Sequence, residues 1–116
     1  MENSSNTLSN CPNLEHLRLF CLDQIVNLNV SASSSLQLKH LDIFQCKSLE
    51  SLEFCAPKLV TFKYFGNLIR LSIGSLPLLA ELDIGASHFH QAKFVLAPFS
   101  SYLSQIETLK LHVRLP

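Results

Sequence analysis

The sequence predicts a solenoid of the mainly β or α/β type, in which short parallel strands stack into a sheet of about five strands. Three observations lead to this fold class. An apolar pattern returns along the 116 residues at nearly constant intervals. The last two apolar positions of each copy are two residues apart, which is the spacing of a strand. Prolines stand at a fixed distance before several copies, where they can fix the turn that enters a strand.

The repeated unit reads apolar-x-x-apolar-x-apolar, and its copies begin at Leu14, Leu38, Leu59, Leu79 and Ile106. The starts lie 24, 21, 20 and 27 residues apart, and the first three intervals fall within the range of about 20–29 residues that is typical of leucine-rich repeats. We therefore expect a leucine-rich-repeat domain at residues 11–116, with four to five repeats and incomplete at both ends. The polar residues 1–10 are expected to form a separate N-terminal segment.

A second series of the same form lies between these copies, and its members begin at Ile25, Leu49 and Leu68. The segments are about six residues long and end in β-branched or aromatic residues, so short convex strands or extended turns are expected rather than helices. The pattern is interrupted between residues 85 and 105, and a short helix is expected near 98–105, with Pro98 near its start. The prolines expected to fix entering turns are Pro12, Pro57 and Pro77.

Side chains alternate in a strand, so the residues between the apolar positions of each concave strand face outward. When the copies are stacked in register, these residues form three columns. The first column is His16, His40, Thr61, Glu81 and Thr108; the second is Arg18, Asp42, Lys63, Asp83 and Lys110; the third is Phe20, Phe44, Phe65, Gly85 and His112. We expect a protein partner to bind this concave face. The residues expected to contact the partner are His16, Arg18, Phe20, His40, Asp42, Phe44, Thr61, Lys63, Phe65, Glu81 and Asp83.

The second column alternates in charge at every step. Each charge would stand between opposite charges on strands about 4.8 Å away, and such pairs stabilise a sheet by roughly 0.2–1 kcal/mol each. This ladder can serve register and solubility, or it can serve partner recognition. The third column begins with three phenylalanines. They can stack to close the turn into the convex side, or they can form an exposed patch that dominates binding to a protein.

No residue pattern indicates catalysis, a cofactor or a metal site, so we expect a protein that is not an enzyme. The acidic residues of the concave face could mimic the cluster of a small β-solenoid hydrolase, but cations in the second column neutralise them. The pair His16 and His40 lacks a third ligand for a metal.

The nine basic and nine acidic residues balance, which argues against binding to nucleic acid or to a membrane surface. The sequence shows no secretory signal and no run of 18 apolar residues, so a cytoplasmic or nuclear protein is expected. The four cysteines contain no C-x-x-C pair, and we expect free thiols that pack as small hydrophobic side chains.

Three further segments share a pattern with one known family. They are Cys11–Leu19 (CPNLEHLRL), Ala56–Gly66 (APKLVTFKYFG) and Leu103–Leu111 (LSQIETLKL). They resemble, in matching order over residues 11–113, the CPxLExLxL, APxLxxFxYxG and LSxVxxLxL segments of plant F-box/leucine-rich-repeat proteins of the F-box/FBD/LRR type. The second segment is the most specific of the three.

The resemblance implies that the repeats are the substrate-recognition part of a Skp1–cullin–F-box ubiquitin ligase, and therefore a non-catalytic protein–protein interaction module. In that family an N-terminal F-box docks on Skp1. No F-box pattern precedes Cys11, so Skp1 binding is not expected of this chain. Two alternatives stay open. The segment Leu38–Leu49 also resembles the repeats of plant nucleotide-binding immune receptors, and the chain could be a truncated remnant with no independent function.

Overall fold

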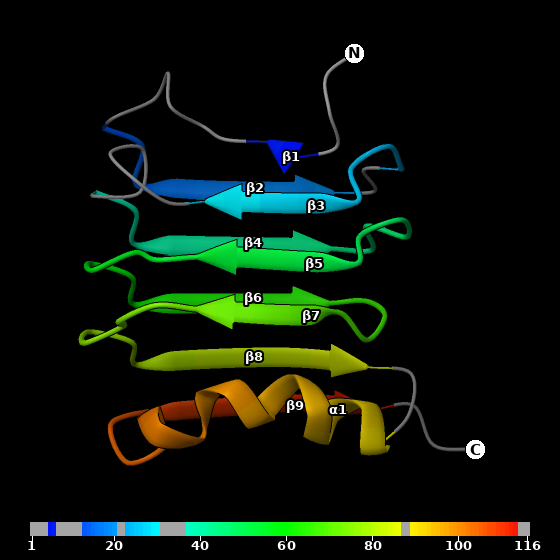
Figure 1. Ribbon diagram of the computed structural model, residues 1–116. Helices are drawn as coiled ribbons and strands as arrows, with labels where there is room; N and C mark the ends of the chain where they lie inside the picture. Colours follow the sequence, from blue (N-terminus) through cyan, green and yellow to red (C-terminus); the bar gives the residue numbers. More distant parts are fainter. Residues whose placement is uncertain (1–4, 7–12, 21–22, 31–36, 87–88, 114–116) are drawn as a thin grey trace.

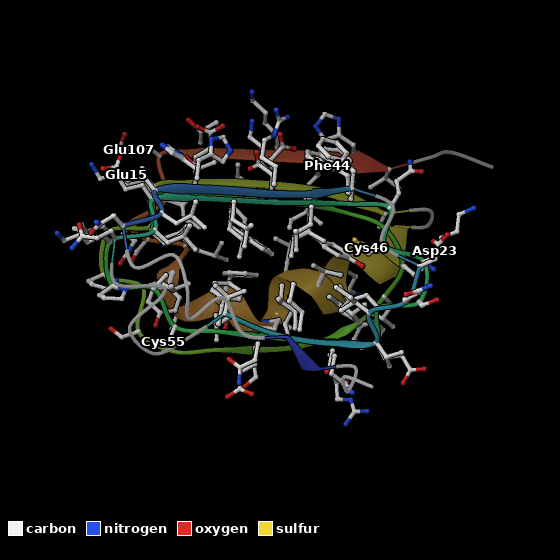
Figure 2. All side chains as sticks on the ribbon, turned by 90° about the horizontal axis from the view of Figure 1, so that it is seen from above. Glu15, Asp23, Phe44, Cys46, Cys55 and Glu107 are labelled. Carbon is white, nitrogen blue, oxygen red and sulfur yellow. The ribbon has the colours of Figure 1, made fainter. Side chains whose placement is uncertain are left out.

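The computed structural model describes residues 5–6, 13–20, 23–30, 37–86 and 89–113. Two parallel β-sheets lie face to face, and the chain passes from one sheet to the other so that successive coils stack along one axis (Figure 1). Seen along that axis, side chains of both sheets fill the space between them, and other side chains point outward on both sides (Figure 2). The arrangement is the solenoid that the sequence predicts.

One sheet has five strands, and each strand begins two residues after the start of a repeat copy. All neighbouring strands in it are parallel. The predicted concave sheet of about five strands is therefore confirmed. In spatial order its strands are β2 (His16–Phe20), β4 (His40–Phe44), β6 (Thr61–Phe65), β8 (Glu81–Ala86) and β9 (Thr108–Val113).

The second sheet has four shorter strands, which also run parallel to one another. Three of them come from the second series of apolar segments, so the prediction of short convex strands is confirmed. The fourth is a two-residue strand close to the N-terminus. In spatial order the strands are β1 (Ser5–Asn6), β3 (Asn27–Val30), β5 (Ser51–Phe54) and β7 (Arg70–Ile73).

Leu68 does not take the buried position that the second series predicts for it. Its side chain is 46% exposed, and Ile69 is buried in its place. The reason is the length of the connection between strands, which is four residues between β6 and β7 but six between β4 and β5. The longer connection closes a turn in which the Leu49 N–H donates to the Cys46 carbonyl at 3.0 Å, and this turn brings Leu49 inward.

Tight turns at residues 56–59 and 76–79 lead the chain back to the five-stranded sheet. In each turn the N–H of the fourth residue donates to the carbonyl of the first, at 3.0 and 3.3 Å. The first and fourth residues are buried and the middle two are exposed, so each turn also places a leucine in the core. Proline stands second, where its fixed φ suits the turn. The prediction is confirmed for Pro57 and Pro77, and Pro12 lies outside the described residues.

A helical segment follows β8, where the preceding coils have a strand of the four-stranded sheet. It consists of α1 (Phe89–Leu96) and the 3-10 helix η2 (Ala97–Tyr102), and it lies in front of β9 in Figure 1. The expected helix near 98–105 was therefore wrong in its bounds, because only η2 overlaps it. Acidic residues in the first turn and a proline near the start are sequence signals for the beginning of a helix. The first turn of α1 has no acidic residue, whereas Pro98 stands at the beginning of η2, so these signals indicated η2 and not α1.

The helical segment is anchored to the core through η2 and the residues after it. Phe99 is fully buried, with its ring centroid 5.5 Å from that of Phe62. The Tyr102 hydroxyl donates to a carbonyl just after β7 at 3.1 Å. The side-chain amide of Gln105 donates to two carbonyls of the turn at 76–79, at 2.9 and 3.0 Å. The segment thus covers the core beside β7.

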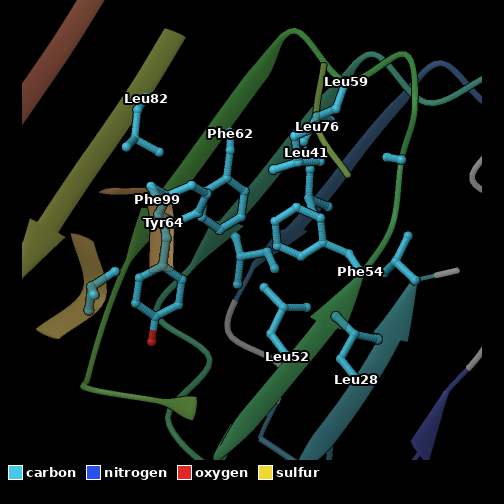
Figure 3. Close-up of a cluster of buried hydrophobic side chains, with 14 of the residues drawn as sticks. Leu28, Leu41, Leu52, Phe54, Leu59, Phe62, Tyr64, Leu76, Leu82 and Phe99 are labelled. Carbon is cyan, nitrogen blue, oxygen red and sulfur yellow. The ribbon is translucent and has the colours of Figure 1, made fainter. Parts of the chain in front are cut away.

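The inward side chains of both sheets form one core (Figure 3). Phe54 from β5 and Phe62 from β6 meet there, with ring centroids 5.1 Å apart. The hydroxyl of buried Tyr64 donates to the Asn67 carbonyl. Burial, and to a smaller extent the Cys46 thiol, raises the pKa of Tyr64, so the hydroxyl keeps the proton that it donates. The largest fully buried side chains are Tyr64, Phe54, Phe62, Phe99, Leu38, Leu41, Ile43, Leu52, Leu59, Leu76, Leu79 and Leu82.

Two of the four cysteines fall within the described residues, and neither forms a disulfide bond. Cys46 is buried, as expected. Cys55 is exposed at the end of β5 (Figure 2), so its expected burial as a small hydrophobic side chain is wrong. Cys11 and Cys21 lie outside the described residues.

We expect Phe99→Ala to lower the free energy of unfolding by about 3–5 kcal/mol, because it removes a fully buried ring from the contact with Phe62. Phe94→Ala is the matched control on α1, since its side chain is 63% exposed, and a change within about 0.5 kcal/mol is expected. Urea denaturation followed by circular dichroism measures both values. Equal losses from the two variants would show that the helical segment is not held through Phe99.

Candidate functional site: the outer face of the five-stranded sheet

The structure brings the predicted concave-face residues together in the predicted columns. Register pairs join His16 to His40, Arg18 to Asp42 and Phe20 to Phe44, and the same alignment continues through β6, β8 and β9. We call the surface that these columns form the outer face of the five-stranded sheet. The core lies on the opposite side of this sheet (Figure 2).

Hydrogen bonds at the start of each coil fix this register. The N–H groups of two consecutive residues, Val60 and Thr61, both donate to the Lys39 carbonyl of the preceding coil, at 2.8 and 3.1 Å. Equivalent pairs of N–H groups donate to the Glu15 carbonyl one coil earlier and to the Val60 and Ala80 carbonyls in later coils. Each coil is therefore aligned to the previous one in the same way, and the three columns stay straight.

The aromatic column is a continuous stack. The rings of Phe20 and Phe44 lie 4.9 Å apart at an interplanar angle of 15°, and those of Phe44 and Phe65 lie 5.2 Å apart at 29°. Phe20 is 52% exposed, while Phe44 and Phe65 are half-buried. Because neighbouring rings cover one another's faces, they present mainly their edges to a partner. The side chain of Phe44 points away from the core (Figure 2).

Gly85 extends this column to β9. A Cβ at this position would lie 2.2 Å from Cδ2 of Phe65, because the Phe65 ring leans over the glycine. The ring thereby reaches His112, with centroids 5.1 Å apart. The repeat pattern places His112 in the third column, but the residues expected to contact the partner do not include it. The glycine that interrupts a column of phenylalanines was the signal that could have drawn attention to it.

The charged column has the predicted register and alternation of sign, but few of its charges form ion pairs. Asp42 is 3% exposed. Its Oδ2 lies 3.1 Å from Nε of Arg18 and 2.8 Å from Nε2 of His16. Within the described ranges Lys63 and Lys110 form no ion pair. Long lysine side chains lose rotamer freedom when they are fixed at a surface, so solvent competes well with a carboxylate neighbour. The register therefore places each charge beside opposite charges, as expected, but among the described residues of this column only Arg18 and Asp42 lie within ion-pair distance.

Asp83 is the second buried carboxylate of the face, with 8% exposure. Its Oδ1 lies 2.9 Å from Nε2 of His112, but the contact does not have hydrogen-bonding geometry. Oδ1 of Asp42 likewise accepts no hydrogen bond from the described residues. A buried acceptor without a donor costs about 1–3 kcal/mol. Both atoms therefore retain capacity to accept hydrogen bonds.

The first column is polar and begins with two imidazoles. The rings of His16 and His40 lie 5.2 Å apart. The remaining members are Thr61, which is buried, Glu81 and Thr108. No group of three or more potential metal ligands occurs within the part of the chain that the structure describes. Beside this column, the Arg18 guanidinium lies 5.3 Å from the centroid of the Phe20 ring, a cation–π contact.

A pocket of about 340 Å³ opens at the end of the aromatic column. It is formed where β4, β6 and β8 end, and by β9. The repeat pattern does not predict this pocket, because several of its lining residues belong to the connections that follow the strands. The residues that line it are Gln45, Cys46, Lys47, Phe65, Gly66, Asn67, Gly85, Ala86 and His112.

Stacked coils with parallel strands, a leucine-rich core and turns at fixed offsets define a leucine-rich-repeat domain. Comparison with protein families agrees, since residues 2–115 match the family model for the leucine-rich-repeat domain of At1g61320/AtMIF1. The chain belongs to this family. Comparison with curated proteins and with solved structures found no match. None of the described helices has the length and apolar character that a membrane crossing requires.

We expect Gly85→Ala to lower the free energy of unfolding by about 1–3 kcal/mol, because the new methyl group forces the Phe65 ring to rotate away. The rotation separates Phe65 from His112, so the ring-current shift on the His112 imidazole protons should shrink. Urea denaturation measures the first effect and proton NMR the second.

The control for this substitution is the same change in a Phe65→Ala background. There the methyl group meets no ring, and Gly85→Ala should cost at least about 1 kcal/mol less than in the wild-type background. An equal cost in both backgrounds would mean that the Phe65 contact is not what requires glycine at this position.

Proposed function

We propose that the chain is a non-catalytic protein-interaction module that binds its partner through the outer face of the five-stranded sheet. Membership of a leucine-rich-repeat family supports an interaction role in general. Leucine-rich-repeat domains are typically non-catalytic interaction modules, which supports the same proposal.

The observation that carries this proposal is the contrast between the outer faces of the two sheets. The five-stranded sheet presents three stacked phenylalanines, one of which is half exposed. Exposed aromatic rings in a continuous patch are the side chains on which binding energy concentrates. The outward positions of the three longer strands in the four-stranded sheet are all polar: Asn27, Asn29, Ser51, Glu53, Arg70 and Ser72.

We further propose that this recognition serves substrate selection by a ubiquitin ligase in the cytoplasm or nucleus. The segment Ala56–Gly66, with its resemblance to F-box/leucine-rich-repeat proteins, supports this role. In the structure this segment supplies a turn, strand β6 and three members of the outer face, Thr61, Lys63 and Phe65. Its resemblance therefore falls on residues that would touch a partner as well as on core positions.

A role as part of a nucleotide-binding immune receptor is the second candidate. It rests on the segment Leu38–Leu49, which resembles the repeats of those receptors and supplies strand β4. Both candidates place the partner on the same outer face. They differ in what the recognition is coupled to, ubiquitin transfer or nucleotide exchange.

Site-specific photocrosslinking tests the proposed face. We expect p-benzoylphenylalanine at position 63, in the centre of the outer face, to give a discrete covalent adduct with a partner in extracts of cells that express the chain. The same crosslinker at position 72, on the outer face of the four-stranded sheet, should give none. Phe44→Ala should reduce the adduct at position 63 at least tenfold, because loss of a hot-spot ring costs about 2 kcal/mol or more.

The thermal melt of Phe44→Ala is the control for folding. Its ring is half-buried and lies outside the core, so the variant should melt cooperatively, close to the wild type. An adduct at position 72 but not at 63, or an adduct at 63 that Phe44→Ala leaves unchanged, would overturn the proposed face.

A further inference from the structure

The pocket at the end of the aromatic column has a floor without bulky side chains. Gly66, Gly85 and Ala86 contribute little more than backbone, and the rings of Phe65 and His112 stand beside them. Because Phe65 leans over Gly85 toward His112, the two rings contact each other and form one continuous aromatic wall. The space therefore suits a side chain with an apolar portion that lies against this wall.

The polar groups of the pocket favour an anion. Among the described residues that line it, none is acidic. Lys47 is exposed and forms no ion pair within the described ranges. Gln45 and Asn67 add side-chain amides that can donate hydrogen bonds. Glu15 and Glu107 lie at the opposite end of the strands, whereas Asp23 lies at the same end as Cys46 (Figure 2).

The stacked phenylalanines add to the same preference. An aromatic ring is electron-rich on its faces and carries a partial positive charge at its edge. Since stacking covers the faces of Phe44 and Phe65, an approaching group meets ring edges. Carboxylate oxygens are attracted to these edges, whereas a cation is not.

The turn that carries Lys47 is held in an unusual backbone conformation. Gln45 has a φ of 56°, the one positive φ of a non-glycine residue in the described part of the chain. Its N–H donates to the Phe65 carbonyl at 2.7 Å, which ties the turn to the end of β6. Such conformations cost stability and are concentrated at binding sites, where the surrounding structure maintains them.

We propose that this pocket binds the side-chain carboxylate of an Asp or Glu residue, flanked by an apolar residue, in the partner chain. Lys47 pairs with the carboxylate, and the apolar neighbour packs on the wall of Phe65 and His112. The assignment rests on the proposed function, because it identifies one anchor of a partner that lies along the outer face. It adds the chemistry of the recognised segment, which is acidic and apolar rather than basic.

NMR titration of the ¹⁵N-labelled chain tests the assignment with two matched peptides, acetyl-Leu-Glu-Leu-amide and acetyl-Leu-Gln-Leu-amide. The Glu peptide should shift the amide signals of Lys47, Gly66, Gly85 and His112 in a saturable way. The Gln peptide should bind at least fivefold more weakly, because it removes the charge and keeps the shape. Lys47→Gln should abolish this preference, whereas Lys93→Gln, the same change at an exposed lysine of α1 outside both the outer face and the pocket lining, should leave it within twofold.

Equal binding of the two peptides, a preference that survives Lys47→Gln, or shifts that map elsewhere would overturn the assignment. Acetyl-Leu-Leu with a free C-terminal carboxylate is the third probe. If it binds while the Glu peptide does not, the pocket takes a chain terminus and the side-chain assignment is wrong. If none of the peptides binds while crosslinking at position 63 persists, the pocket assignment alone is rejected. Loss of crosslinking while the peptides still bind would reject the proposed face and leave the pocket.

Discussion

The hydrogen bonds that join each coil to the one before it set the register on which the rest of the structure depends. At four successive steps, two consecutive N–H groups donate to one carbonyl of the preceding coil, at distances of 2.8–3.1 Å. A slip by one residue would break these bonds and would also turn every apolar side chain from the core to the outside. The hydrogen bonds and the hydrophobic pattern therefore select the same register, although they act on different atoms.

The outer face follows from that register. Strands lie about 4.8 Å apart, and the centroids of the stacked phenylalanine rings repeat at 4.9 and 5.2 Å, so the stack adopts the spacing of the backbone beneath it. The contact between Phe65 and His112 across Gly85 also depends on the strand register. Its missing side chain lets Phe65 bend toward His112, and this is possible because glycine stands in register with that ring.

Apart from β1, the strands, their order and the three columns could be predicted from the sequence, because each depends on a local pattern repeated several times. Other features depend on contacts that a local pattern does not contain. Helix α1 lacks an acidic first turn and is held by packing through Phe99, so helix-start signals did not locate it. The burial of Ile69 in place of Leu68 depends on the length of the connection between β6 and β7. The ion pairs depend on rotamers, and the pocket depends on connections that meet only in space.

Several features that lower stability lie on the outer face and at its edge. Within the described residues, the buried side-chain atoms without a hydrogen-bond partner are Oδ1 of Asp42 and Oδ1 of Asp83, and both belong to this face. The strained backbone of Gln45 lies at its edge, and the half-exposed ring of Phe20 lies on it. A surface shaped for stability alone would carry solvated polar groups, as the opposite sheet does. Departures from local rules are expected on a surface shaped for binding, and those on this face support the proposal that the domain binds its partner through the five-stranded sheet.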